Sequence, residues 1–180
     1  MATAQDLRFG IEGGWAAADL GAKNTATSLA TLTSRTVTYT EEAASPAGRI
    51  FVEVPVQENI SAEVGYFATT SLDATYTFSG TTVTAKEGAT ANGIDFGAKL
   101  NVNDTMFFRA GLHRSKLNQS VTVSISGTSY TASLSQSGTG SYFGGGINLD
   151  DNLSLGVTQY LDLGGLSGAD ATFFFIGYRF

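Results

Sequence analysis

The sequence predicts an all-β fold: a closed, antiparallel, up-and-down barrel of eight transmembrane strands. Apolar residues recur at every second position in eight segments, as in Leu7, Phe9 and Ile11, while charges and glycines occupy the positions between them. Such a period of two is typical of strands whose two faces differ in polarity. Each segment is also about as long as a tilted membrane strand, which needs roughly 9 to 11 residues. Connections that alternate between short and long give a third indication.

The eight predicted strands form a single domain over residues 1–180. They cover approximately residues 7–18, 48–56, 60–70, 91–100, 105–114, 140–149, 153–163 and 170–180.

Composition excludes several classes of protein. The 180 residues contain no Cys, one His and only 14% charged residues, with a net charge of -6. A nucleic-acid partner is not expected, because binding phosphate needs clustered Lys and Arg. Without Cys there is neither a disulfide nor a thiolate metal site. We predict no cofactor, no metal site and no catalytic residue.

The polar face of the predicted strands carries acids and bases in equal number. Its members are expected to form an ionic network: Arg8, Glu12, Arg49, Glu53, Glu63, Asp95, Lys99, Arg109, His113, Asp162 and Arg179. Alternation alone would also fit a soluble barrel. The glycines between these charges favour the membrane barrel over the soluble one. On a solvated face they would only weaken the strands, whereas inside a narrow barrel they leave room for long side chains. We therefore place the apolar face against lipid and the ionic face inside.

The C-terminal segment 173–180 ends in Phe, with aromatic or apolar residues at alternate positions. It resembles the last strand of bacterial outer-membrane β-barrel proteins. The resemblance implies that Phe174, Ile176, Tyr178 and Phe180 form the signal read by the barrel assembly machinery. The whole chain is similar to the group formed by the OmpA transmembrane domain, OmpX and the opacity proteins. That similarity implies a monomer in the outer membrane, in contact with lipid and lipopolysaccharide.

Residues near the ends of the chain and of the strands fit this location. Trp15, Tyr66 and Tyr178 lie on the lipid face near predicted strand ends, where aromatic girdles form. The stretch 2–4, Ala-Thr-Ala, is typical of the cleavage site that ends a signal peptide, so we expect the sequence to start near the mature N-terminus, with Met1 in place of the signal peptide. An ordinary cytoplasmic start is the alternative at this point.

The connections place the long loops at one end of the barrel. Tight turns at 57–59, 101–104 and 150–152 alternate with long loops at about 19–47, 69–90 and 115–139; the connection at 164–169 is short. This pattern fits periplasmic turns, with both termini on their side, and extracellular loops. Two of the loops contain predicted hairpins, at 75–84 and 121–134. The first loop shows a weaker alternation over 29–39.

Three functions remain open on the sequence. The first is a non-enzymatic surface protein whose long hairpins contact an extracellular protein or ligand, or which supports envelope integrity. The second is a narrow OmpW-like channel or conduit for small or hydrophobic solutes. The third rests on His113 and Ser115, whose spacing resembles the catalytic pair of barrel-type lipid A deacylases. However, Lys116 stands where that family has Asn, and no acid follows within about fifteen positions to orient the imidazole.

Overall fold

The computed structural model describes residues 7–180. Eight strands form its main body: β1 (Arg8–Ala17), β3 (Ser45–Gln57), β4 (Ile60–Thr69), β6 (Thr84–Asn101), β7 (Met106–Ile125), β8 (Thr128–Asn148), β9 (Leu153–Leu161) and β10 (Ala171–Arg179). The remaining elements are α1 (Ala22–Thr33), β2 (Val37–Glu41), β5 (Leu72–Phe78) and a single 3-10 turn, η1 (Leu163–Gly165).

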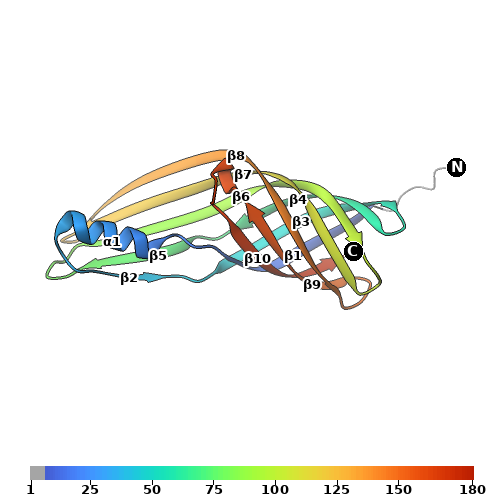
Figure 1. Cartoon of the computed structure of the whole chain (residues 1–180), viewed down its shortest axis with the longest axis horizontal. Helices are drawn as coiled ribbons and strands as arrows, with labels where there is room; N and C mark the ends of the chain where they lie inside the picture. Colours follow the sequence, from blue (N-terminus) through green and yellow to red (C-terminus); the bar gives the residue numbers. More distant parts are fainter. Residues whose placement is uncertain (1–6) are drawn as a thin grey trace.

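The eight strands of the main body form a closed ring (Figure 1). Their order is β6-β4-β3-β1-β10-β9-β8-β7, and pairing between β6 and β7 joins the two ends. Every neighbouring pair is antiparallel. Because the ring is closed, it has no open sheet edge. Such an edge would leave backbone N–H and C=O groups unpaired in the hydrocarbon of a membrane. The predicted fold class is confirmed, and each predicted segment overlaps one ring strand.

Three strands are much longer than the sequence predicts. β6, β7 and β8 have 18, 20 and 21 residues, and their distal halves project from the barrel. There they continue as a five-stranded sheet in the order β2-β5-β6-β7-β8, drawn at the left of Figure 1. Both predicted loop hairpins are present, as the β5–β6 pair and as the end of the β7–β8 pair.

The first long loop differs from the prediction. The sequence predicts a long loop with a weak alternation over 29–39, whereas the chain is helical in α1 and residues 37–41 form β2. Ala22, Ala26 and Leu29 follow the i, i+4, i+7 spacing of a helix face. This face packs on an apolar patch of the projecting sheet that includes Tyr76 and Phe78. The sheet, which is distant in sequence, therefore selects the helix.

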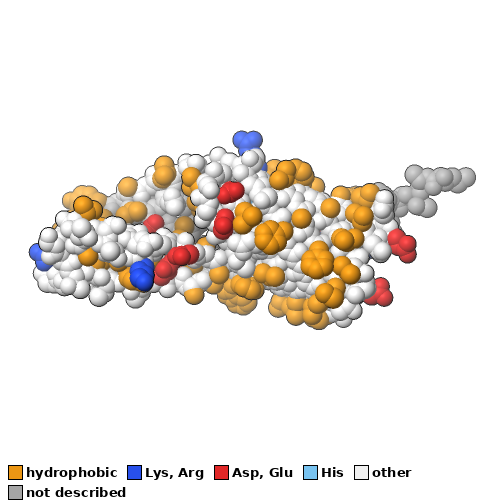
Figure 2. All heavy atoms as spheres, viewed as in Figure 1, with side chains coloured by type: hydrophobic (Ala, Val, Ile, Leu, Met, Phe, Trp, Pro, Cys, Tyr) orange, Lys and Arg blue, Asp and Glu red, His pale blue; other side chains and the backbone are white. Residues whose placement is uncertain are grey.

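The two faces of the ring have opposite polarity. Outward side chains such as Ile50, Val64 and Phe108 are more than half exposed. Figure 2 shows such apolar side chains gathered over the barrel half of the molecule, with few charges among them. Inward charged side chains such as Arg49 and Glu53 are at most 2% exposed. Among residues 7–180, no helix is long and apolar enough to cross a membrane.

The opposite end of the barrel has the tight turns. In two of them a side-chain oxygen organises the turn: Asn103 accepts the N–H groups of Thr105 and Met106, and Asp150 does the same for the residues at its own turn. Phe180 donates its backbone N–H to Phe9, so the start of β1 and the end of β10 lie together there. The Ala-Thr-Ala stretch at 2–4, assigned from sequence to a signal-peptide cleavage site, lies outside the described residues.

Candidate functional site

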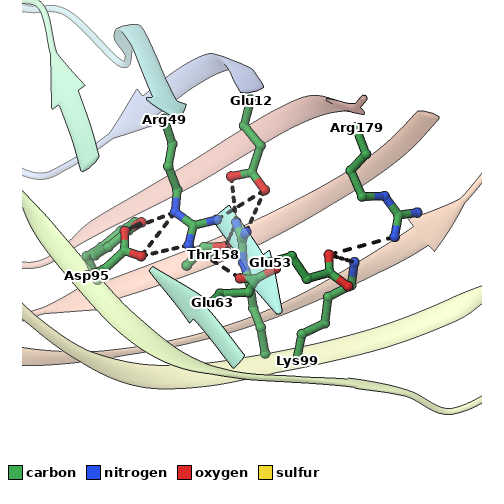
Figure 3. Close-up of polar contacts among 10 residues, drawn as sticks. Glu12, Arg49, Glu53, Glu63, Asp95, Lys99, Thr158 and Arg179 are labelled. Atoms are coloured by element: carbon green, nitrogen blue, oxygen red, sulfur yellow. Dashed lines mark hydrogen bonds and ion pairs between the residues drawn. The ribbon is translucent and has the colours of Figure 1, made fainter. Parts of the chain in front are cut away.

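Arg49 on β3 is the centre of the buried ionic network (Figure 3). Its guanidinium donates to Asp95 on β6, two strands away beyond β4, with Nη2–Oδ1 and Nε–Oδ2 distances of 2.6 and 2.9 Å. The same group contacts Glu63 at 3.3 Å and Glu12 at 3.5 Å. Three carboxylates from three strands thus share one cation. Buried charges are tolerated when they are paired in this way.

Arg109 on β7 joins a further strand to the same cluster. Its Nη1 lies 2.6 Å from Glu12 Oε1 and its Nη2 lies 3.1 Å from Oε2, a bidentate pair. Its Nε donates to Thr158 on β9 at 2.8 Å. The guanidinium also stacks over Phe175, 4.4 Å from the ring centre, an arrangement that favours a desolvated cation. Glu12 therefore connects both arginines.

A second ionic group lies between this cluster and the tight turns. Glu53 Oε2 is 3.2 Å from Lys99 Nζ and 3.8 Å from Arg179 Nη1. Arg179 also donates to Asn148 at 3.0 Å. Together the two groups hold four acids and four bases, all buried: Glu12, Glu53, Glu63 and Asp95 with Arg49, Lys99, Arg109 and Arg179. The network is therefore formally neutral.

Three residues assigned to the network from sequence lie elsewhere. Arg8 is exposed, because the first residue of β1 is at the rim of the barrel. Asp162 follows the end of β9, where the alternation stops; it has a φ of 58° and accepts the Gly168 N–H, so it holds the β9–β10 loop. His113 is buried but belongs to an aromatic layer. The observed network thus lacks one predicted base, Arg8, and one predicted acid, Asp162, so acids and bases remain equal in number.

The aromatic layer lies above the ionic network, on the side of the long loops. It is built from Phe67, Tyr142, Tyr160 and Phe173, with further buried apolar residues around them. The imidazole of His113 packs edge-on against Phe67 and Tyr160, and its Nε2 donates to the Leu161 carbonyl at 2.8 Å. Sequence parity placed His113 inside, but it could not distinguish this layer from the charges beneath it.

Glycines on the inner face make room for these side chains. A Cβ on Gly65 would lie 2.6 Å from Arg49 Nε. A Cβ on Gly140 would lie 2.6 Å from His113 Nε2. Both distances are far below a normal contact, so these two positions accept only glycine without displacing their neighbours.

The β7–β8 hairpin presents a different kind of site outside the barrel. β8 pairs with β9 only from Ser141 onward, and the 3-10 turn η1 lies against residues 136–138 of β8, so residues 128–135 have a strand neighbour on one side only. The face of the hairpin that continues the inner face of the barrel carries large apolar side chains, of which Val123 packs against the cluster formed by α1 and the projecting sheet. Four others are 44–63% exposed: Val121, Ile125, Tyr130 and Leu134. We call these four residues the hairpin strip.

Sequence analysis found this hairpin but missed the strip. Val121 is opposite Ala132 and Val123 is opposite Tyr130, so the register places apolar side chains of both strands on one face. The alternation of Tyr130, Ala132 and Leu134 was a usable signal. It could be recognised as a surface only once α1 was known to cover the neighbouring strands.

The outward face holds the predicted membrane-contact residues. Trp15, Tyr66 and Tyr178 are 60%, 47% and 43% exposed. The four C-terminal residues assigned to the assembly signal also point outward, and Tyr178 packs edge-on against Phe180. Two polar residues on this face, Gln159 and Thr172, are paired strand neighbours and hydrogen-bond to each other.

The longer β7 adds basic residues to the same face. Beyond Leu112, the outward positions of β7 are Arg114 and Lys116, both exposed. They follow the last apolar outward residue of this strand on the side of the long loops. Among residues 7–180, no group of three or more His, Asp or Glu residues is placed to hold a metal ion.

An apolar outer belt, a neutral ionic lumen, tight turns at one end and projecting hairpins at the other define a membrane-embedded barrel of the outer-membrane type. Comparison with solved structures agrees. Ail, the attachment invasion locus protein of Yersinia pestis, matches with a TM-score of 0.56 at 11% identity, over 96% of this chain and 98% of that chain. Its complex with the heparin analogue sucrose octasulfate matches with a TM-score of 0.55 at 11% identity, over 97% and 99%.

The outer membrane protein OprG of Pseudomonas aeruginosa matches with a TM-score of 0.53 at 11% identity, over 98% of this chain and 97% of that chain. No family model and no curated protein matches the sequence. At these identities the likeness shows the fold. The chain thus has the fold of small bacterial outer-membrane β-barrel proteins, as its C-terminal strand predicted.

Proposed function

We propose that this protein is a non-enzymatic outer-membrane barrel that contacts a partner protein at the cell surface through the β7–β8 hairpin. One observation carries the proposal: the open edge of β8, at residues 128–135, lies beside the exposed hairpin strip. An extended segment of a partner could add to this edge by main-chain hydrogen bonds, and its side chains could cover the strip. Unprotected edges of this kind otherwise promote aggregation.

Charge argues for a protein rather than a polyanion as the partner. The solved complex of Ail contains a heparin analogue. In the loop half of this chain, acids outnumber bases: Asp19, Glu41, Glu42, Asp73, Glu87, Asp162 and Asp170 against Lys23, Arg35, Lys86, Arg114 and Lys116. Binding a highly sulfated ligand needs a surplus of positive charge. We therefore do not propose a heparin-like ligand for this protein.

The outward bases on β7 have a separate role in the proposal. Arg114 and Lys116 lie beyond the apolar belt on the side of the long loops. We place them at the level of the lipopolysaccharide phosphates, where Arg and Lys form charge-assisted hydrogen bonds. In the same account the barrel is monomeric, because its ring is closed by its own strands, and Phe174, Ile176, Tyr178 and Phe180 serve as the signal for the assembly machinery.

The contact proposal is tested by placing charge on one face of the hairpin. Tyr130→Lys and Leu134→Lys put a cation into the hairpin strip, whereas Ser133→Lys puts the same charge on the opposite face of β8. Cells expressing each variant are compared for attachment to epithelial monolayers and to isogenic cells that lack the barrel. Heat-modifiable migration on gels verifies that each barrel is folded.

We expect the two strip variants to lose most of the attachment conferred by the unmodified barrel, and Ser133→Lys to retain it. Equal attachment by all three variants would refute a role for the strip. Attachment that is absent even with the unmodified barrel would refute the adhesive function and leave envelope support as the role to examine.

The channel alternative conflicts with the interior. The ionic network and the aromatic layer fill successive levels of the lumen with side chains that are nearly all below 10% exposure. An eight-stranded ring is only wide enough to be filled in this way or to hold one small ligand. We expect planar-bilayer recording to show no stable conductance. Steps that change when Arg109 or Glu53 is neutralised would instead favour a channel.

The enzymatic alternative is also disfavoured by geometry. His113 Nε2 is bonded to the Leu161 carbonyl, and Ser115 Oγ accepts the Gly164 N–H at 2.9 Å. Both side chains face the lumen and hold the β9–β10 loop, whereas a lipid A enzyme must meet its substrate at the lipid face. We expect mass spectra of lipid A to be identical with and without expression of the barrel.

A further inference from the structure

A cavity of about 370 Å³ opens at the loop end of the barrel, above the aromatic layer. Its walls come from six ring strands, from β5, from the β1–α1 connection and from the β9–β10 loop. Leu117, Leu163 and Ala171 belong both to the cavity lining and to the buried aromatic layer. The aromatic layer is therefore its floor. A volume of this size is within the range of small-molecule sites.

The lining combines apolar walls with acids of one sign. Small and aliphatic side chains such as Ala89, Leu72 and Leu166 form most of it, and among residues 7–180 the only charged residues that line it are Asp19, Glu87 and Asp170. These three come from different segments: the β1–α1 connection, β6 and the β9–β10 loop. No Lys, Arg or His of the part of the chain that the structure describes lines the cavity.

The three carboxylates are held in place and keep capacity for a ligand. Glu87 Oε2 accepts the Tyr76 hydroxyl at 3.0 Å, and Asp170 Oδ1 accepts the Asp162 N–H at 3.0 Å. Asp19 Oδ1 accepts the Gly21 N–H at 2.7 Å. Within residues 7–180 each of these bonds uses one oxygen of its carboxylate.

We propose that this cavity binds a small amphipathic organic cation, which enters from outside the cell, buries its apolar body against the walls and pairs its ammonium with the acids. The site is distinct from the hairpin strip, so it goes beyond the contact function proposed above. Because the floor is closed by Phe67, Tyr160 and Phe173, the ligand is held rather than passed through.

Three probes of nearly equal size separate charge from hydrophobicity: 2-phenylethylammonium, 2-phenylethanol and 3-phenylpropanoate. The barrel is reconstituted in nanodiscs with methyl-labelled Ala, and each probe is titrated while NMR shifts are followed. We expect the cation to shift Ala89 and Ala171 saturably, the alcohol to do so more weakly, and the anion not to do so.

Variants locate the site and test the charge. Ala89→Phe should abolish the saturable shift at Ala171, because it fills the cavity without changing charge. Asp170→Asn should weaken cation binding about tenfold, the effect of losing about 1.4 kcal/mol. Glu58→Gln removes an acid from a tight turn at the other end and should leave affinity unchanged. Heat-modifiable migration verifies folding of each variant.

Two results would overturn the proposal. Equal affinity for the cation and the anion at Ala89 would remove the role of the acids. A cation effect that survives Ala89→Phe, or that is confined to outward-facing alanines such as Ala62 and Ala98, would mean partition into lipid rather than binding in the cavity.

Discussion

At the scale of single residues, Arg49 has the largest structural role. It is 2% exposed and contacts three carboxylates on three other strands. An ion pair removed from water contributes little net free energy while it is intact, but loss of one partner leaves the other charge buried without compensation. Removal of the Arg49 side chain would take a cation away from three buried carboxylates at once.

Arg49→Met should therefore lower the free energy of unfolding by about 3 to 5 kcal/mol, the cost of breaking a buried pair. Urea unfolding in detergent micelles, followed by gel migration and tryptophan fluorescence, measures the change. Arg8→Met is the matched control, since Arg8 is exposed at the rim, and it should change stability by less than about 0.5 kcal/mol. Similar losses for the two variants would contradict the assignment.

Glycine positions test the packing of the same side chain. Gly65→Ala places a Cβ 2.6 Å from Arg49 Nε and should cost about 1 to 3 kcal/mol, as overpacking of interiors does. Gly13→Ala is the control, because nothing lies within 4 Å of its Cβ position. The same unfolding assay distinguishes them. A Gly65→Ala variant as stable as Gly13→Ala would mean that the lumen has unused room.

At the scale of elements, alternation located all eight ring strands but not where three of them end. The polarity of β6, β7 and β8 changes beyond the membrane, where Thr and Ser replace large apolar residues, so the contrast between their faces weakens while the strands continue. α1 could not be predicted for a related reason. Its apolar face is narrow, and the sheet on which it packs is formed by later residues.

The projecting sheet contains a charge pair suited to a pH measurement. Lys86 Nζ on β6 lies 2.7 Å from Asp73 Oδ2 on β5. This bond, together with the Ser71 hydroxyl, holds the pKa of Asp73 below its ordinary value of 3.8. A carboxyl whose pKa is lowered by folding stabilises the folded state above its unfolded pKa, and that contribution is lost as pH falls through the folded pKa.

Lys86→Met should raise the pKa of Asp73 toward its ordinary value, and the projecting sheet should lose this acid-sensitive contribution. Titration of the Asp73 carboxyl carbon by NMR between pH 2 and 6 provides the measurement. Lys116→Met, which removes the same charge from the outward face of β7, should leave the Asp73 titration unchanged. An equal rise of the Asp73 pKa in both variants would mean that the protein's positive charges in general, and not the bond to Lys86, lower it.

At the scale of the whole molecule, polarity is reversed relative to a water-soluble protein. The apolar belt faces outward and the lumen holds a neutral set of four acids and four bases. The sequence predicted this reversal because parity separates the two classes of residue along every strand. The prediction wrongly included Arg8 and Asp162 in the network, because β1 begins at Arg8 and β9 ends just before Asp162. Parity also could not show that the interior is divided into an ionic level and an aromatic level above it.

The most direct measurement of this reversal uses the two faces of β10. The sequence has one Trp, Trp15, so Trp15→Phe gives a background without tryptophan fluorescence. Phe174→Trp then places an indole on the outward face and Phe175→Trp places one on the inward face, where Phe174 is 52% and Phe175 is 4% exposed. In vesicles with brominated acyl chains, strong quenching of the Phe174→Trp variant and weak quenching of the Phe175→Trp variant are predicted. Equal quenching, or the reverse order, would contradict a barrel with lipid outside and charges within.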